Sequence, residues 1–106
     1  MRKIGYGRVS TADQTTEVQE AALRGAGCEL VFVEKISSRA PLEKRLMLQA
    51  ALSELQEGDV LVVSKLDRLG RNQTEIVSRL DSLNQQGVHL KTLDGFIDTK
   101  ALGIMA

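Results

Sequence analysis

The chain has 106 residues, 42% of them hydrophobic, so it is long enough for one hydrophobic core and too short for two. Its 14 basic and 14 acidic residues cancel, so net charge gives no sign of nucleic-acid binding, and an aromatic content of 3% excludes the base-stacking surfaces of single-strand and RNA binders. The single cysteine, Cys28, excludes an internal disulfide. No apolar run approaches the roughly 20 residues of a membrane span and no leader is recognisable. We therefore expect a cytoplasmic protein with no membrane partner.

The first third of the chain predicts a strand followed by a helix. Residues 2–9 form the strand candidate, and Ser10-x-x-Asp13 resembles a capping box that would start a helix at Ser10 or at the residue after it. This helix would run to about residue 26 and end at Gly27. Its expected apolar face consists of Val18, Ala22 and Leu23.

The middle of the chain predicts a strand, a loop, a helix and a second strand. Residues 29–34 alternate weakly, as a strand does, and residues 35–44 lose all periodicity and contain the only proline. This is the one loop long enough to move. Residues 45–56 carry leucines at helical spacing, at Leu48, Leu52 and Leu55. Residues 60–64 are nearly all apolar, which is typical of a central parallel strand.

The last third repeats the alternation of helix and strand. Asn72-x-x-Glu75 predicts a helix start, Gly87 its end, and residues 88–93 a fourth strand, followed by a loop. The expected buried stripe of this helix is Ile76, Val77, Leu80 and Leu83. Alternating strands and helices predict a three-layer α/β fold with right-handed crossovers. We expect a mainly parallel sheet of four to five strands, in the order 2-1-3-4, with helices on both faces.

Two polar clusters follow apolar strands. Tyr6, Arg8 and Ser10 are spaced by two, so in an extended strand they would share a face. The second cluster, Lys65-Leu66-Asp67-Arg68-Leu69-Gly70-Arg71, follows the strand at 60–64. If these strands are parallel neighbours, both clusters lie at the carboxyl edge of the sheet, where open α/β sheets bind their ligands.

Ser10 admits two interpretations that are compatible with each other. A serine between a strand and a helix is most often an N-cap, whose hydroxyl accepts a backbone hydrogen bond. The arginine on its own face, together with Lys65, Arg68 and Arg71, indicates more positive charge than capping requires. Because helix N-termini also attract anions, a phosphate bound at Ser10 would be held by the backbone as well.

The remaining polar residues narrow the chemistry. Arg68 and Arg71 share a face if their turn is helical, and Arg45 opens a helix just after the loop, from which it could reach the same phosphate. Asp67 fits equally an orienting partner for the arginines and a proton carrier. The only histidine, His89, is expected to be structural, so a serine–histidine–acid triad lacks its base. No spacing of acids suggests a metal site. A hydroxyl nucleophile among arginines suits phosphoryl transfer.

A dinucleotide-binding site is the rival hypothesis. Gly5-x-Gly7-x-x-Ser10 partly matches the glycine fingerprint after a first strand, with Glu34 near the place of a ribose-binding acid. Serine stands where the third glycine or alanine is needed, and Arg8 would crowd the pyrophosphate turn. The signal is weak, and a P-loop is absent.

Four segments, in their order and spacing, resemble the serine recombinases of the resolvase/invertase branch, and the resemblance covers essentially the whole chain. They are Tyr6-Gly7-Arg8-Val9-Ser10-Thr11, Glu34-Lys35-Ile36-Ser37, Arg45, and Lys65 to Arg71. The resemblance implies a resolvase-like catalytic domain that acts on double-stranded DNA at a specific recombination site. The serine would attack a phosphodiester and form a 5′-phosphoserine intermediate before strand exchange and religation. It implies no metal or nucleotide cofactor.

Carried over by position, the resemblance assigns roles to residues of this chain. Ser10 would be the nucleophile, and Asp67 would orient arginines or transfer a proton. The phosphate would be bound by Arg8, Arg45, Lys65, Arg68 and Arg71, and the site supported by Tyr6, Gln14, Glu34 and Lys65. Glu34 stands where aspartate is commoner, and the loop Ser37-Ser38-Arg39-Ala40-Pro41 lacks the usual glycine after the serine, which predicts a stiffer loop.

The resemblance also implies parts beyond this chain. The family continues into a long dimerising helix and a helix-turn-helix module, so we expect residues 1–106 to be one domain, mostly monomeric and inactive by itself. The full-length protein would form a homodimer and a synaptic homotetramer. A non-catalytic DNA-binding or regulatory domain of the same fold is the alternative.

Overall fold

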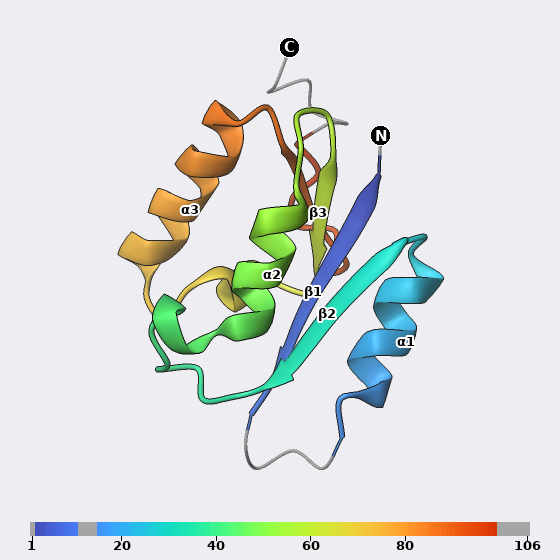
Figure 1. Ribbon diagram of the computed structural model, residues 1–106, viewed down its shortest axis with the longest axis vertical. Helices are drawn as coiled ribbons and strands as arrows, with labels where there is room; N and C mark the ends of the chain where they lie inside the picture. Colours follow the sequence, from blue (N-terminus) through green and yellow to red (C-terminus); the bar gives the residue numbers. More distant parts are fainter. Residues whose placement is uncertain (1, 11–14, 100–106) are drawn as a thin grey trace.

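The computed structural model describes residues 2–10 and 15–99 and shows strands alternating with helices (Figure 1). Within these residues lie four strands, three α-helices and two 3₁₀ turns. In chain order they are β1 Lys3–Val9, α1 Glu17–Gly25, β2 Leu30–Lys35, η1 Leu42–Lys44, α2 Leu46–Glu54, β3 Val60–Val63, η2 Leu66–Leu69, α3 Gln73–Gln85 and β4 His89–Thr92.

The strands form one parallel sheet in the order β2-β1-β3-β4, which confirms the predicted topology. All four residues of β3 are buried, as expected for a strand covered on both faces. Tyr6 of β1 lies beside Phe32 of β2 and Val63 of β3. Because the strands are parallel, the segments that follow β1, β2 and β3 all leave the same edge of the sheet.

Helices cover both faces, so the fold has three layers (Figure 1). Even-numbered residues of β1, such as Ile4 and Tyr6, join a core with Leu48 of α2 and Leu83 of α3. On the opposite face, Leu23 of α1 packs in a second core with Cys28, Val60 and Val62. The period-two alternation of the strands thus separates the residues under α2 and α3 from those under α1.

The start and the apolar face of the first helix were predicted wrongly. The helix begins at Glu17 and its N-cap residue is Thr16, so Ser10 is not its N-cap. Of the three residues expected on its apolar face, Leu23 is fully buried, whereas Ala22 is exposed and Val18 is 74% exposed. This helix is therefore anchored to the sheet mainly through Leu23.

The third helix agrees with its predicted start and end and differs in its stripe. Asn72 caps it by accepting a hydrogen bond from the Glu75 amide at 2.9 Å, and Gly87 follows its last turn with a φ of 74°. Leu83 is buried, but Val77 is 58% exposed, because the helix contacts the sheet over a narrower strip than the sequence suggests.

Two glycines of β1 allow α1 to approach the sheet closely. A Cβ added at Gly5 would lie 3.0 Å from Cys28 Sγ and 3.1 Å from Leu23 Cβ, and one at Gly7 would lie 3.0 Å from Gln19 Oε1. These distances are shorter than ordinary van der Waals contacts. The second core therefore depends on the absence of side chains at these two positions.

Replacement of Gly5 by alanine is expected to destabilise the protein by about 1–3 kcal/mol, because the methyl group would push α1 away from the sheet. Chemical denaturation would measure the change in the free energy of unfolding. Gly25→Ala is the matched control, since a Cβ at Gly25 meets nothing within 4 Å. An unchanged stability of Gly5→Ala would contradict the close packing of α1.

Asp59 joins the start of β1 to the turn between α2 and β3, at the amino edge of the sheet. Its carboxylate accepts hydrogen bonds from the Arg2 amide at 3.1 Å, the Arg2 guanidinium at 3.0 Å and the Gln56 amide at 2.9 Å. Burial acts to raise the pKa of Asp59, but hydrogen bonds from Gln56 and Arg2 outweigh it and lower the pKa. The folded state is thus stabilised by the ionised carboxylate.

Acid should remove this stabilisation. Because the folded-state pKa of Asp59 is lowered, its contribution is present above the unfolded-state pKa of about 3.9 and is lost as the pH falls below it. Asp59→Asn should lower the stability at pH 7 by about 1–3 kcal/mol and give a shallower acid limb than the wild type. Thermal melts from pH 2 to pH 7 test both effects, and parallel acid limbs would show that Asp59 is not responsible.

No helix within residues 2–10 and 15–99 has the length and apolar character needed to cross a membrane.

Candidate functional site

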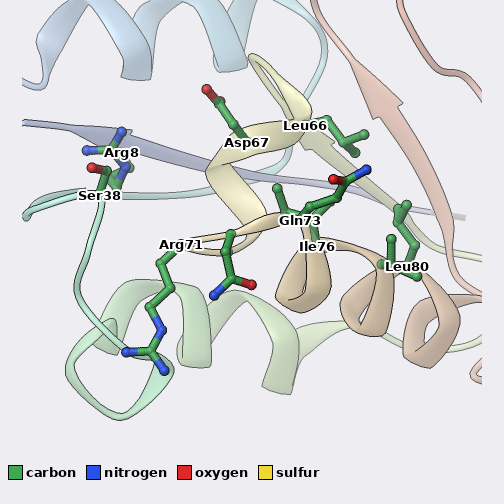
Figure 2. Close-up of a pocket in the computed structure, with 11 residues that line it drawn as sticks. Arg8, Ser38, Leu66, Asp67, Arg71, Gln73, Ile76 and Leu80 are labelled. Carbon is green, nitrogen blue, oxygen red and sulfur yellow. The ribbon is translucent and has the colours of Figure 1, made fainter.

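The two polar clusters meet at the carboxyl edge of the sheet, as predicted. A pocket of about 510 Å³ is lined there by Arg8 of β1, Ser38 of the loop after β2, Asp67 of η2, and Arg71. Figure 2 shows Arg8 and Ser38 at one side of this pocket and the first turns of α3 at the other. The α3 side is largely apolar, lined by Leu66, Ile76, Val77 and Leu80.

Arg8 places a buried positive charge in this pocket. It is 7% exposed, and its Nη1 donates a hydrogen bond to the carbonyl oxygen of Ile36 at 3.0 Å. Burial lowers the pKa of Arg8, and the positive charges of Arg68 and Arg45 lower it further. Among the described residues its buried Nε has no hydrogen-bond partner. A guanidinium still protonated at neutral pH, with an unused donor, is suited to bind an anion.

Arg45, the N-cap residue of α2, is buried. Only 1% of it is exposed, and its guanidinium donates to three carbonyl oxygens: Nε to Ala40 at 2.9 Å, Nη1 to Arg68 at 3.0 Å and Nη2 to Ser38 at 2.9 Å. Arg45 therefore ties the loop after β2 to η2, and these two segments form adjoining walls of the pocket.

The η2 turn presents Asp67 and Arg68 as an ion pair. Arg68 Nη1 lies 3.0 Å from Asp67 Oδ1, which is the contact that an orienting role of Asp67 requires. The Nε of Arg68 is buried and has no hydrogen-bond partner within the described part of the chain. Leu69 is fully buried and anchors the turn to the core, and the exposed Lys65 precedes it in an extended conformation.

Arg71 does not share a helical face with Arg68, because η2 ends at Leu69 and the chain is extended at Gly70. Its guanidinium pairs instead with Glu75, at 2.6 Å between Nε and Oε2. Figure 2 shows the Arg71 side chain directed away from Arg8 and Asp67. The structure therefore gathers Arg8, Arg45 and Arg68 more closely than Arg71.

Glu34 has a role that sequence reasoning missed. Its carboxylate accepts hydrogen bonds from the Tyr6 hydroxyl at 2.6 Å and from the amides of Met47 at 3.1 Å and Leu48 at 3.3 Å. It therefore caps α2 from a neighbouring strand, because the residue at the helix N-cap, Arg45, provides no side-chain cap. A helix that lacks its own capping residue is the sequence signal that could have revealed this contact.

The Tyr6 hydroxyl is held in its protonated form. Burial raises its pKa, and the hydrogen bond to Glu34 and the negative charge of that residue raise it further. Tyr6 is the only tyrosine and the chain has no tryptophan, so its ionisation can be followed directly by ultraviolet absorbance.

We expect no phenolate absorbance in the folded protein near pH 10, the ordinary pKa of tyrosine. Because the folded-state pKa of Tyr6 is raised, the protonated hydroxyl stabilises the folded state fully below pH 10, and this stabilisation is lost as the pH rises above that value. Phenolate should therefore appear together with alkaline unfolding. Absorbance at 295 nm and circular dichroism along one pH titration test this. Ionisation near pH 10 without loss of structure would contradict the Tyr6–Glu34 contact.

Ser10 and Gln14 are the other predicted site residues, and His89 was expected to be structural. Ser10 directly follows β1 and is partly buried, while Gln14 lies outside the described residues. His89 begins β4 and so lies at the opposite edge of the sheet from Arg8. Ser38 lines the pocket but was not singled out from the sequence.

The dinucleotide-binding hypothesis is wrong, because the glycines of the proposed fingerprint do not lie in a turn. Gly5 and Gly7 lie within β1 and face α1, whereas the fingerprint needs them in the turn after the strand, against a pyrophosphate. Among residues 2–10 and 15–99, no three histidine, cysteine, aspartate or glutamate side chains are grouped as metal ligands.

A parallel sheet that is covered by helices on both faces, with the buried guanidinium groups of Arg8 and Arg45 at its carboxyl edge, defines a three-layer α/β protein. The chain belongs to the resolvase family, since residues 3–103 match the model of the resolvase N-terminal domain. It is 46% identical over 98 residues to the serine recombinase Gin of Escherichia phage Mu, covering 92% of this chain and 50% of that protein. The DNA-invertase of Escherichia phage P1 is 45% identical over 96 residues, covering 91% and 50%. The DNA-invertase Hin of Salmonella typhimurium is 42% identical over 101 residues, covering 95% and 52%. The chain spans about half the length of these relatives.

Proposed function

We propose that this chain is the catalytic domain of a site-specific DNA recombinase that cuts and rejoins double-stranded DNA through Ser10. The observation that carries the proposal is the group of Arg8, Arg45 and Arg68 at the carboxyl edge of the sheet, in which the Nε atoms of Arg8 and Arg68 are buried without a partner among the described residues. Buried cations with unused donors favour an anionic ligand such as a phosphodiester.

The reaction is a transesterification at phosphorus. The Ser10 Oγ–P bond forms as the P–O3′ bond of the DNA breaks, which leaves a 5′-phosphoserine link and a DNA 3′-hydroxyl that carries the proton lost by Ser10. Religation reverses these steps after strand exchange, so the bond energy is kept in the covalent link. Arg8 and Arg68 would stabilise the negative charge on the equatorial oxygens, and Asp67 would orient Arg68.

Arg45 has two possible tasks within this proposal. Its three carbonyl hydrogen bonds support a role in holding the pocket walls, and its closeness to Arg8 supports an electrostatic contribution to phosphate binding. Direct contact with the phosphate would require it to release at least one of these carbonyls. Arg71, Lys65, Tyr6 and Gln14 remain proposed site residues on the basis of the family resemblance.

The complete protein would act in the cytoplasm as a homodimer and as a tetramer when two sites are paired. Names of the relatives include both invertases and a serine recombinase, and the direction of recombination depends on how the sites are arranged. We therefore propose the shared chemistry of DNA cleavage and rejoining, whether its outcome is inversion or resolution.

Ser10→Ala in the complete protein should abolish the covalent protein–DNA adduct while DNA binding is retained. The recombination site is first located by footprinting the protein on DNA that flanks its own gene. The substrate is a nicked duplex that carries this site, and adducts are detected by denaturing electrophoresis. Ser53→Ala is the matched control, because Ser53 is exposed and its hydroxyl donates within α2, to the Gln49 carbonyl oxygen. An adduct formed by Ser10→Ala would show that Ser10 is not the nucleophile. Site binding by the wild type without any adduct would favour a non-catalytic DNA-binding domain.

A further inference from the structure

Glu75, in the first turn of α3, contacts Arg71 twice. Its Oε1 accepts a hydrogen bond from the Arg71 backbone amide at 3.0 Å, and its Oε2 accepts one from the Arg71 Nε at 2.6 Å. The short second contact is a charge-assisted hydrogen bond. One carboxylate thus holds both the main chain and the guanidinium of a residue on the rim of the pocket.

The position of Glu75 is itself closely defined. The Glu75 amide donates to Asn72 Oδ1 at 2.9 Å, which fixes the first turn of the helix. A Cβ added at Gly70 would lie 2.8 Å from Glu75 Cβ and 3.2 Å from the Ile76 amide nitrogen, so the chain before α3 passes directly against this turn. The carboxylate therefore projects from a well-supported turn toward Arg71.

A guanidinium offers a phosphate two edges, one formed by Nε with an Nη atom and the other by both Nη atoms. Glu75 occupies the Nε of Arg71 and so removes the first edge. Neither Nη atom of Arg71 has a hydrogen-bond partner among residues 2–10 and 15–99, and the side chain is 44% exposed. Only the edge with both Nη atoms is left for a ligand.

We propose that Glu75 is a positioning residue that restricts Arg71 to one orientation and presents its two Nη atoms to a phosphate of the DNA backbone at the rim of the pocket, away from the phosphate that Arg8 and Arg68 would bind. This inference rests on the proposed function. Without Glu75 the long side chain would sample several rotamers, and ordering it on DNA would oppose binding. The expected loss is roughly 2- to 12-fold, the effect of immobilising one flexible side chain.

The carboxylate also places a negative charge near the phosphate, and its removal acts in the opposite direction. These two effects differ in their dependence on salt, because an exposed charge is screened by ions whereas rotamer restriction is not. A loss caused by disorder of Arg71 should persist at 0.3 M salt. A change in DNA binding that arises from charge alone should become smaller at this salt concentration.

The first test follows the Arg71 Nε–H group by nuclear magnetic resonance in the complete protein labelled with ¹⁵N-arginine. Glu75→Gln keeps an oxygen that can accept the backbone bond but removes the charge, so we expect hydrogen exchange of the Arg71 Nε–H to accelerate several-fold while the Tm changes little. Glu20→Gln is the matched control: Glu20 pairs with Arg24 at the same spacing on α1, at 3.2 Å. It should affect Arg24 and leave Arg71 unchanged. Equal exchange of Arg71 in the wild type and in Glu75→Gln would overturn the proposal.

The second test is a double-mutant cycle on the rate of adduct formation at 0.15 M and 0.3 M salt, with Glu75→Gln, Arg71→Ala and both together. We expect Glu75→Gln to lower the rate 2- to 12-fold in the wild type and to change nothing in Arg71→Ala. An equal loss in both backgrounds, or a gain in the wild type, would overturn the proposal.

If the wild type forms no adduct, the proposed function has failed, and the cycle is then measured on the affinity for a DNA duplex. The same dependence on Arg71 in that measurement would support the positioning role, and its absence would overturn it.

Discussion

The carboxyl edge of the sheet is organised by the burial of Arg45 against main-chain carbonyls. A buried cation is costly unless it is hydrogen-bonded, and here each of the three guanidinium nitrogen atoms donates to a carbonyl oxygen, of Ser38, Ala40 or Arg68. Those carbonyls belong to the loop after β2 and to η2. Because the cation stabilises the fold only when both segments are in place, it fixes the two walls between which Arg8 lines the pocket.

Glu34 and Tyr6 extend this arrangement into the core. Arg45 stands at the beginning of α2, and Glu34 holds the first amides of the same helix while it accepts the Tyr6 hydroxyl. Tyr6 is fully buried among the residues that pack under α2 and α3. The direction in which Arg45 points is thus connected, through a helix end and one carboxylate, to the main hydrophobic core.

Much of the fold follows from the sequence, because periodicity and burial are local signals. The apolar run at 60–63 predicted a central strand, and the alternation of strands and helices predicted a parallel sheet with helices on both faces. The start of α1 was wrong because a serine after a strand looks like an N-cap, whether or not the helix begins there. Its apolar face was wrong because the helix is oriented with Val18 and Ala22 toward solvent, and only Leu23 is buried, against Gly5 and Gly7. The burial of Arg45 could not be predicted, because the backbone carbonyls that bind it are present in every residue and leave no pattern in the sequence.

In the loop after β2, Arg45 binds backbone carbonyl oxygens and does not require particular side chains. The guanidinium binds carbonyl oxygens at Ser38 and Ala40, which every amino acid possesses, and it makes no demand on what those residues carry. The side chain of Ser38 lines the pocket. It can therefore be replaced without loss of the hydrogen bond between Arg45 and the Ser38 carbonyl oxygen. A domain built in this way separates the residues that anchor the pocket from a rim whose side chains can be substituted to change the shape and charge of the pocket.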